Sequence, residues 1–133
     1  MDKTLILNII LSGFLSGLII FQTLLAAPIV FTSLKQDQAR IFIRKVFPRL
    51  FKFLYIIGLL MLIVNFLSNS TYMLLYIVSS LTFIFPLICA LMVDVTNKAT
   101  DDGNIQKFKF LHTLSVILTM IVLILNLFWA FFI

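Results

Sequence analysis

The sequence predicts an all-α membrane protein: a bundle of four transmembrane helices, with a basic amphipathic helix in the membrane interface before the second span. Hydrophobic residues make up 62% of the 133 residues and charged residues only 11%, whereas soluble domains are about half apolar and a quarter charged. Several uncharged runs are long enough to cross a bilayer, and the cations are concentrated between them. The length fits one integral membrane domain over residues 1–133.

The first span is predicted over residues 5–31. Residues 4–34 carry no charge, and this run exceeds the ~20 residues that a helix needs to cross the hydrocarbon core. A cleaved signal peptide is the alternative, but its apolar region is only about 7–15 residues long. No polar cleavage segment follows the run, so we expect a retained helix.

The next uncharged run, residues 53–93, is predicted to fold into a helical hairpin. As one helix it would be about 60 Å long, twice the thickness of the hydrocarbon core. Its polar cluster at Ser68–Ser70 favours a turn, and Ser70 or Thr71 can cap the following helix. We therefore expect spans over residues 50–67 and 71–93.

The fourth span is predicted over residues 109–132, because residues 110–133 form the last uncharged run. Residues 34–49 and 94–108 are expected to be loops. The first of these connections, extended to Lys52, holds six of the ten cations, and the second, extended to Lys109, holds three. Since lysine and arginine concentrate in cytoplasmic loops, both connections are expected inside and both termini outside, in a bacterial inner membrane.

The basic segment at residues 40–53 is predicted to form an amphipathic helix, because at 100° per residue its cations and its apolar side chains fall on opposite halves. Such a helix lies in the interface with its cations toward anionic headgroups. Pro48 is expected to break or kink the chain at the start of the second span, or to be its first residue. The cations assigned to this surface are Arg40, Arg44, Lys45, Arg49 and Lys52.

Membrane lipid is the expected partner of this basic surface, and an anionic ligand or the acidic surface of a partner protein is the alternative. Nucleic acid is not an expected partner, because the phenylalanines of the segment lie on the face opposite the cations, in lipid. A basic net charge of +5 therefore reflects topology and lipid contact.

Neutral polar and small residues follow the predicted spans, and no charged side chain lies deep within one. The lack of such charges argues against a proton pump or an ion-coupled transporter. One interpretation of the polar stripes is helix packing, because small and polar residues join transmembrane helices. Gly13 and Gly17 form a GxxxG pattern of this kind, and Pro28 and Pro86 are assigned to packing as well.

The other interpretation is a small polar cavity in the cytoplasmic half of the bundle. Pro86 lacks a backbone donor and frees the carbonyl of Thr82, which can then bind a ligand or a water. The single histidine can ligate haem iron or copper, or carry protons, but one histidine cannot complete such a site within a monomer. The candidate ligand residues are Gln22, Thr82, His112 and Ser115.

The sequence lacks the residue patterns of common enzymes. It contains no Gly-rich phosphate loop, no paired carboxylates and no Ser–His–Asp set, and Cys89 is a lone cysteine. A lone cysteine allows neither an internal disulfide nor a cysteine-based zinc cluster. We therefore predict no catalytic residue and no metal site, and we keep haem or copper only as an alternative.

Two parts of the chain resemble one family of small membrane proteins. They are Leu25–Leu34 (LAAPIVFTSL) with Val46–Phe51 (VFPRLF), and Phe110–Ser115 (FLHTLS) with Asn126 further on. The chain resembles domain of unknown function 4149, to which the transmembrane-protein-205-like proteins belong. The resemblance implies a four-span bundle with no established enzymatic activity, some members being linked to metal-drug resistance and membrane trafficking. More distantly, the chain is similar to copper-resistance membrane domains and a haem-pathway oxidase, whose early-helix histidines it lacks.

Three functional hypotheses follow. We expect a non-enzymatic membrane protein that packs with partner subunits or with its own copies, or that binds lipid or a small hydrophobic ligand. The first alternative is a haem-, copper- or quinone-associated protein that uses His112. The second is a small efflux or transport protein, which would act as an oligomer because four helices are few for alternating access.

Overall fold

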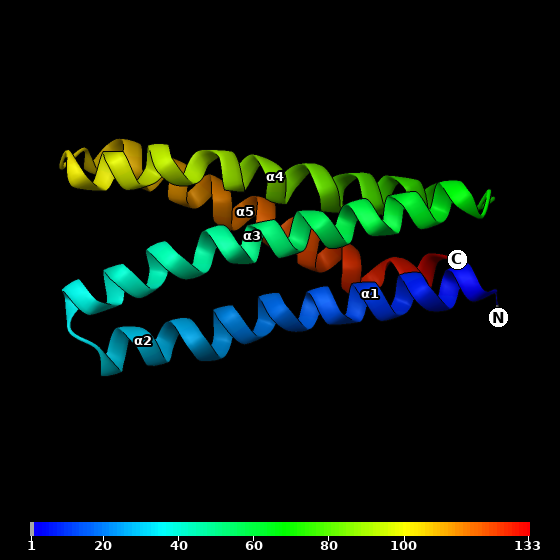
Figure 1. Cartoon of the computed structure of the whole chain (residues 1–133), viewed down its shortest axis with the longest axis horizontal. Helices are drawn as coiled ribbons and strands as arrows, with labels where there is room; N and C mark the ends of the chain where they lie inside the picture. The colour runs from blue at the N-terminus through cyan, green and yellow to red at the C-terminus, as the bar shows by residue number, and fades with distance from the viewer. Residues whose placement is uncertain (1) are drawn as a thin grey trace.

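The computed structural model describes residues 2–133, and these residues form helices joined by short turns (Figure 1). Four of the helical elements are long and apolar enough to cross a membrane, which confirms the predicted all-α, four-helix fold. The elements are α1 (Lys3–Ile20), the π-helical segment η1 (Phe21–Ala26), α2 (Ala27–Ser33), α3 (Gln36–Leu67), α4 (Met73–Asp101), α5 (Ile105–Phe128) and the 3-10 segment η2 (Trp129–Phe132).

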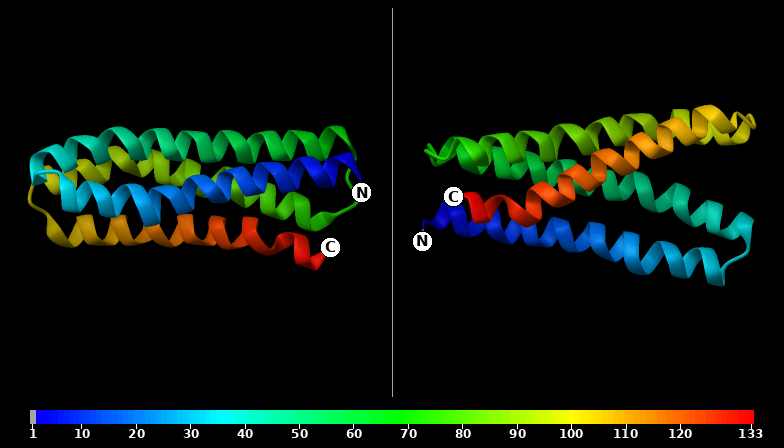
Figure 2. Two further views of the ribbon diagram at one scale, coloured as in Figure 1. Left: turned by 90° about the horizontal axis from the view of Figure 1, so that it is seen from below. Right: turned by 180° about the vertical axis from the view of Figure 1, so that it is seen from behind.

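Consecutive spans run antiparallel, and α1 begins at the end of the bundle where η2 finishes (Figure 1). α3 packs along α4 and α4 along α5, while α1 lies against both α5 and α3. At the opposite end, which carries the α2–α3 and α4–α5 connections, the α1–α2 element diverges from the start of α5 (Figure 2, right). We call this the basic end, because nine of the ten cations lie in the α2–α3 connection, in α3 and around the α4–α5 connection.

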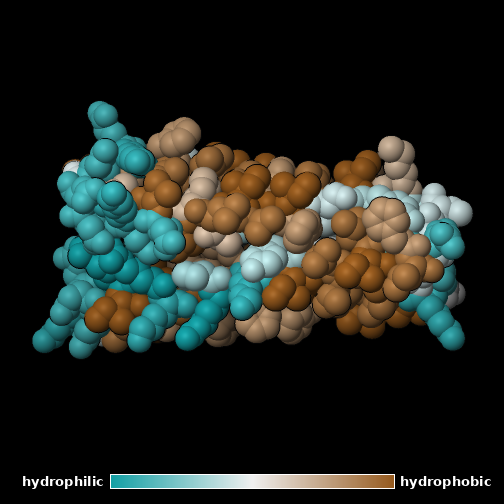
Figure 3. All heavy atoms as spheres, turned by 45° about the horizontal axis from the view of Figure 1, so that its top comes forward, coloured by the Kyte–Doolittle hydropathy of each residue, from teal (hydrophilic) through white to brown (hydrophobic). Residues whose placement is uncertain are grey.

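The surface of the bundle has the distribution expected of a membrane-embedded protein. A hydrophobic band separates two hydrophilic ends, and the hydrophilic area is larger at the basic end (Figure 3). Large apolar side chains such as Leu24 and Leu91 are 67% and 73% exposed within the spans. Lipid, rather than protein, covers them when the helices cross a bilayer.

The basic segment forms the first part of α3 and is not a separate helix. α3 runs from Gln36 to Leu67 with Pro48 inside it. The expected break at Pro48 is therefore wrong, and so is the alternative that a helix begins there. α4 contacts α3 on both sides of the proline: the guanidinium of Arg44 binds the carboxylate of Asp101, and Gly58 lies against the backbone of Thr82. This packing stabilises the helix where the proline removes one backbone hydrogen bond.

The two predicted loops at the basic end are mostly helical. α3 already begins at Gln36 and α4 continues to Asp101, so most of residues 34–49 and 94–108 are helical, while the bounds of the membrane-crossing parts stay a prediction. Hydropathy shows where a helix leaves the hydrocarbon, but not where it ends. A helix as long as α3 measures about 48 Å, well above the ~30 Å of the hydrocarbon core, so we expect its basic end to project out of the membrane as a helix.

The turn expected between the second and third spans is present between Leu67 and Met73. Asn69 has a φ of 49°, a left-handed conformation that asparagine adopts more readily than most residues. The helix cap differs from the expectation, because the N-cap of α4 is Tyr72. Ser70 contributes by accepting a hydrogen bond from the backbone N–H of Tyr72 at 3.3 Å.

Among the glycines of the spans, Gly58 makes a close approach to a neighbouring helix, and the GxxxG pattern of α1 does not. A Cβ atom on Gly58 would lie 2.5 Å from the backbone nitrogen of Phe83 and 2.5 Å from the carbonyl carbon of Thr82. Gly13 and Gly17 have no atom within 4 Å of such a Cβ, so they make no close contact within the chain. Their role in contacts with another protein stays a prediction.

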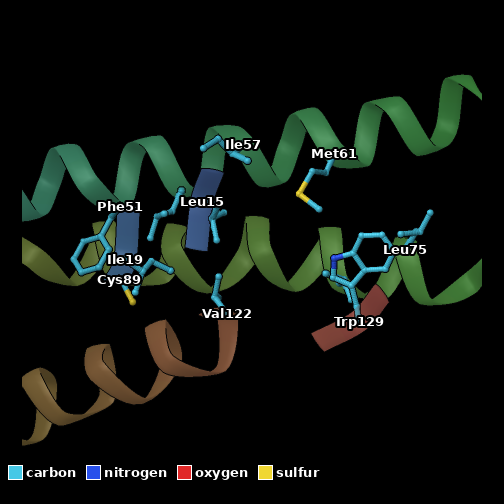
Figure 4. Packing of buried hydrophobic residues seen from close by; sticks show 11 residues of the cluster. Leu15, Ile19, Phe51, Ile57, Met61, Leu75, Cys89, Val122 and Trp129 are labelled. Atoms are coloured by element: carbon cyan, nitrogen blue, oxygen red, sulfur yellow. The ribbon is translucent and has the colours of Figure 1, made fainter. Parts of the chain in front are cut away.

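The apolar core runs along the bundle axis and draws on all four spans. At one end of the view in Figure 4, Phe51, Ile19 and Cys89 lie together, and at the other end Trp129 lies beside Leu75. Pro86 is fully buried on α4, whereas Pro28 is exposed on α2. Pro28 therefore does not pack inside the bundle.

Candidate functional site

Two buried polar networks join the helices in the half of the bundle that contains the termini. In the first network, Asn8 Nδ2 donates to Asn65 Oδ1 at 2.8 Å. Asn65 Nδ2 in turn donates to Leu75 O and to Ser79 Oγ, both at 3.3 Å. The network thus ties α1 to the hairpin of α3 and α4.

The second network is centred on Asn126 of α5. Its Oδ1 accepts a hydrogen bond from Ser12 Oγ at 2.8 Å, and its Nδ2 donates to Thr82 Oγ1 at 2.8 Å. Trp129 Nε1 donates to Ser12 Oγ at 2.9 Å. Thr82, a candidate ligand residue from the sequence, is therefore occupied in helix packing.

The basic half of the bundle contains a cavity of ≈ 330 Å³ where the helices diverge. Its walls come from α1, η1 and α2 on one side, and from α3, α4 and α5 on the others. Three of the four candidate ligand residues, Gln22, His112 and Ser115, line this one cavity. Most of the remaining wall is apolar and includes the aromatic rings of Phe31, Phe47, Phe51 and Phe108.

Gln22 is the distinctive polar residue of this cavity. Its side chain is 7% exposed, and its Nε2 atom has no hydrogen-bond partner among residues 2–133. A buried donor without a partner is costly, so this amide is suited to bind a group that enters the cavity. The sequence pattern identified Gln22 as a candidate but gave no sign that its amide is unpaired.

The backbone around Gln22 departs from α-helical geometry. η1 is a π turn in which the N–H of Ala27 donates to the carbonyl of Gln22, five residues earlier. Pro28 follows directly, and its missing N–H removes the α-helical bond to the carbonyl of Leu24. π turns within α-helices are frequent at functional sites, and this one lies beside the cavity.

The α5 wall of the cavity is ordered by hydrogen bonds from side chains to a backbone carbonyl and by stacking. Thr119 Oγ1 donates to the carbonyl of Ser115 at 2.8 Å, and Cys89 Sγ donates to the same carbonyl at 3.8 Å. The ring of His112 stacks on Phe108 with a centroid separation of 5.5 Å. His112 is exposed at the cavity rim and can present a ring nitrogen to a bound molecule.

The only cation that lines the cavity is already neutralised. Arg44 donates to both carboxylate oxygens of Asp101, at 2.5 and 3.3 Å, and to the carbonyl of Asn97 at 3.4 Å. Sequence reasoning placed Arg44 in a lipid-facing basic surface and missed this pair, because Asp101 was expected in a loop. The polar groups left free in the cavity are therefore mainly neutral.

Within residues 2–133 no group of three or more His, Cys, Asp and Glu side chains could hold a metal ion. His112 accordingly has no set of protein co-ligands among these residues. The four remaining cations of the predicted basic surface lie apart from the cavity, since the lining includes Arg44 but none of Arg40, Lys45, Arg49 or Lys52.

Four antiparallel apolar helices with a cavity at the basic end define the class of protein, a small polytopic membrane protein. The family model described as Domain of unknown function (DUF4149) matches residues 10–86. The match covers more than half of the chain, so the chain belongs to this family. No curated protein and no solved structure matches it. The matched region contains Gln22 and the α3 wall of the cavity, whereas His112 and the rest of α5 lie outside it.

Proposed function

We propose that the protein is a non-enzymatic membrane protein that binds an amphipathic molecule in the cavity at the basic end. The observation that carries the proposal is the buried amide of Gln22, which lines the cavity and whose Nε2 has no partner among residues 2–133. A hydrogen-bond acceptor on the bound molecule would satisfy this donor.

The lining supports a lipid-like or quinone-like ligand. Ligand sites are typically about 300–1,000 Å³, mostly apolar, with a few polar groups that fix orientation. The aromatic and aliphatic wall suits an apolar body, and Gln22, Ser115 and His112 suit a neutral acceptor such as a carbonyl or ester oxygen. Because Asp101 neutralises Arg44, the cavity has no free cation to select an anionic headgroup.

The position of the cavity supports entry from the bilayer. Its lining comes from α1, η1, α2 and α5, at the end of the bundle where α1–α2 and α5 diverge (Figure 2, right). It also includes Arg44 of α3, so we expect it near the level at which α3 leaves the hydrocarbon. An amphipathic molecule in a membrane places its polar group at this level. Packing with partner membrane proteins, in which the exposed Gly13 and Gly17 would take part, is compatible with such binding.

Replacing Gln22 by leucine is expected to weaken binding of a short-chain monoacylglycerol by about tenfold, because a hydrogen bond of about 1.4 kcal/mol corresponds to that factor. The purified protein in a neutral detergent is titrated with the monoacylglycerol, and binding is measured by calorimetry. Folding should not suffer, since Nε2 of the amide makes no hydrogen bond within residues 2–133.

The matched control is Gln106→Leu, the same substitution at an exposed residue of α5 outside the cavity. Q106L should bind like the wild type. Equal binding by wild type and Q22L, or equal weakening in Q22L and Q106L, would count against the cavity as the site. A decylquinone is titrated in parallel, and tighter binding of it than of the monoacylglycerol would indicate a preference for quinones. In that case His112→Ala should also weaken binding.

We propose a bacterial inner-membrane location with the basic end in the cytoplasm and both termini outside. Cysteine at Thr71 should react with a membrane-impermeant maleimide in intact cells, and cysteine at Asp102 should react only after lysis. The native Cys89 is 1% exposed and should give little background. Labelling of the Asp102 position before lysis, with protection at Thr71, would reverse the orientation.

The closer resemblance to transmembrane-protein-205-like proteins stays a prediction. A haem, copper or transport role has less support than binding of an amphipathic molecule, because it has no structural observation of its own beyond the position of His112 at the cavity rim.

A further inference from the structure

The structure separates the cations of α3 into two kinds. Arg44 is bound to Asp101 and faces the cavity. Arg49 and Lys52 are exposed and form no ion pair with any carboxylate of the described chain. They line a second hollow of ≈ 300 Å³ together with Phe53 and Ile56. These four residues, which we call the α3 groove, share one face of the helix, roughly opposite the face that lines the cavity.

The α3 groove lies at the depth where hydrocarbon meets headgroups. Arg49 and Lys52 are 18 and 15 residues before Leu67, which is about 27 and 22 Å along a helix. The hydrocarbon core is about 30 Å thick. With the hairpin turn at one surface of this core, the backbone of both residues lies inside the core, close to its opposite surface.

The packing of α3 against α4, its antiparallel neighbour, places Lys52 at the same depth independently. Gly58 lies level with Thr82 and Phe83, so Lys52 is level with residues 88–89 of α4. The first charged residue of α4 is Asp94, about 8 Å further along the helix. The side chain of Lys52 must therefore extend toward the membrane surface to place its ammonium group in the polar layer, where phosphate groups lie.

We propose that Arg49 and Lys52 bind the phosphate of an anionic phospholipid, whose acyl chain lies along Phe53 and Ile56. This site is independent of the cavity and of its ligand. Cations three residues apart on one helix face can both contact one phosphate. The apolar half of the groove continues from the cations toward the bilayer centre, which is the direction in which an acyl chain runs from its headgroup.

The test compares phosphatidylglycerol with phosphatidylcholine of the same acyl chains. Each lipid is added to the purified full chain in a neutral detergent, and retained lipid is measured by native mass spectrometry. The wild type should retain phosphatidylglycerol in preference. The Arg49→Gln/Lys52→Gln variant should retain about 25-fold less, because each of the two basic residues near an anionic surface contributes a factor of roughly five.

The matched control is Lys98→Gln/Lys107→Gln, which removes two exposed charges from the same end of the bundle but outside the groove. It should retain phosphatidylglycerol like the wild type. Equal loss in both double variants would show that net charge alone attracts lipid, and would overturn the proposal. The absence of any preference in the wild type would also overturn it.

The source of the phosphate is settled by adding millimolar inorganic phosphate to the wild type. Phosphatidylglycerol should stay bound, because the apolar half of the groove contributes to retention. Displacement of the lipid, with inorganic phosphate retained in its place, would overturn the lipid assignment in favour of a free anion. Circular dichroism and elution volume, which should match the wild type in both variants, separate loss of lipid from loss of fold.

Discussion

Replacing Gly58 by alanine is expected to destabilise the helical hairpin by about 1–3 kcal/mol, the usual cost of inserting a methyl group into a packed interface. The added Cβ would lie 2.5 Å from backbone atoms of Thr82 and Phe83. A backbone cannot move aside as a side chain can, so α3 and α4 would have to separate along their contact. Loss of helicity in a detergent–SDS titration of the purified protein measures the change.

The controls are Gly13→Ala and Gly17→Ala, where a Cβ meets no atom within 4 Å. Both should leave the stability unchanged or raise it slightly, because alanine favours a helix more than glycine does. Destabilisation by G13A as large as that by G58A would mean that the exposed face of α1 is an interface in the purified protein. Unchanged stability of G58A would contradict the close approach itself.

Replacing Asn126 by leucine should cost about 2 kcal/mol, since its amide makes three buried hydrogen bonds and such bonds average ~0.6 kcal/mol in membrane proteins. The leucine also leaves Thr82 Oγ1 without its donor. The same detergent–SDS titration measures this change.

A double-mutant cycle with Ser12→Ala tests whether the residues act as a network. Ser12 Oγ donates to Asn126 and accepts from Trp129, so the two substitutions should cost less together than the sum of their separate effects. Strictly additive costs would show that Ser12 and Asn126 stabilise the bundle separately. Thr32→Val is the control, because Thr32 is exposed and bonds only within its own helix.

The fold could be predicted from hydropathy because the hydrocarbon dictates where apolar runs must be. The same signal could not place the helix ends at the basic end, since a helix outside the hydrocarbon needs no apolar run. The local chemistry of Pro48 alone predicted a break in the helix. The helix is continuous there because α4 packs against α3 on both sides of the proline.

The candidate site was predicted in part. Periodicity places residues on a face of a helix, which brought Gln22, His112 and Ser115 to the same cavity. Periodicity does not show which side chain of a neighbouring helix faces a given residue. Thr82 was therefore predicted to bind a ligand, although its hydroxyl accepts a hydrogen bond from Asn126. The π turn at Gln22 and the tight contact at Gly58 depend on backbone geometry that no residue pattern specifies.

The two polar networks have a consequence for how the bundle can move. Both lie in the half that contains the termini, whereas an exposed ion pair between Arg44 and Asp101 links α3 to α4 in the other half. Thermal opening should therefore be one-sided, with the networks as a hinge and the α1–α2 arm swinging at the basic end. Opening at the basic end would widen the space between α1–α2 and the other helices. A molecule could then enter without breaking any buried hydrogen bond of the two networks.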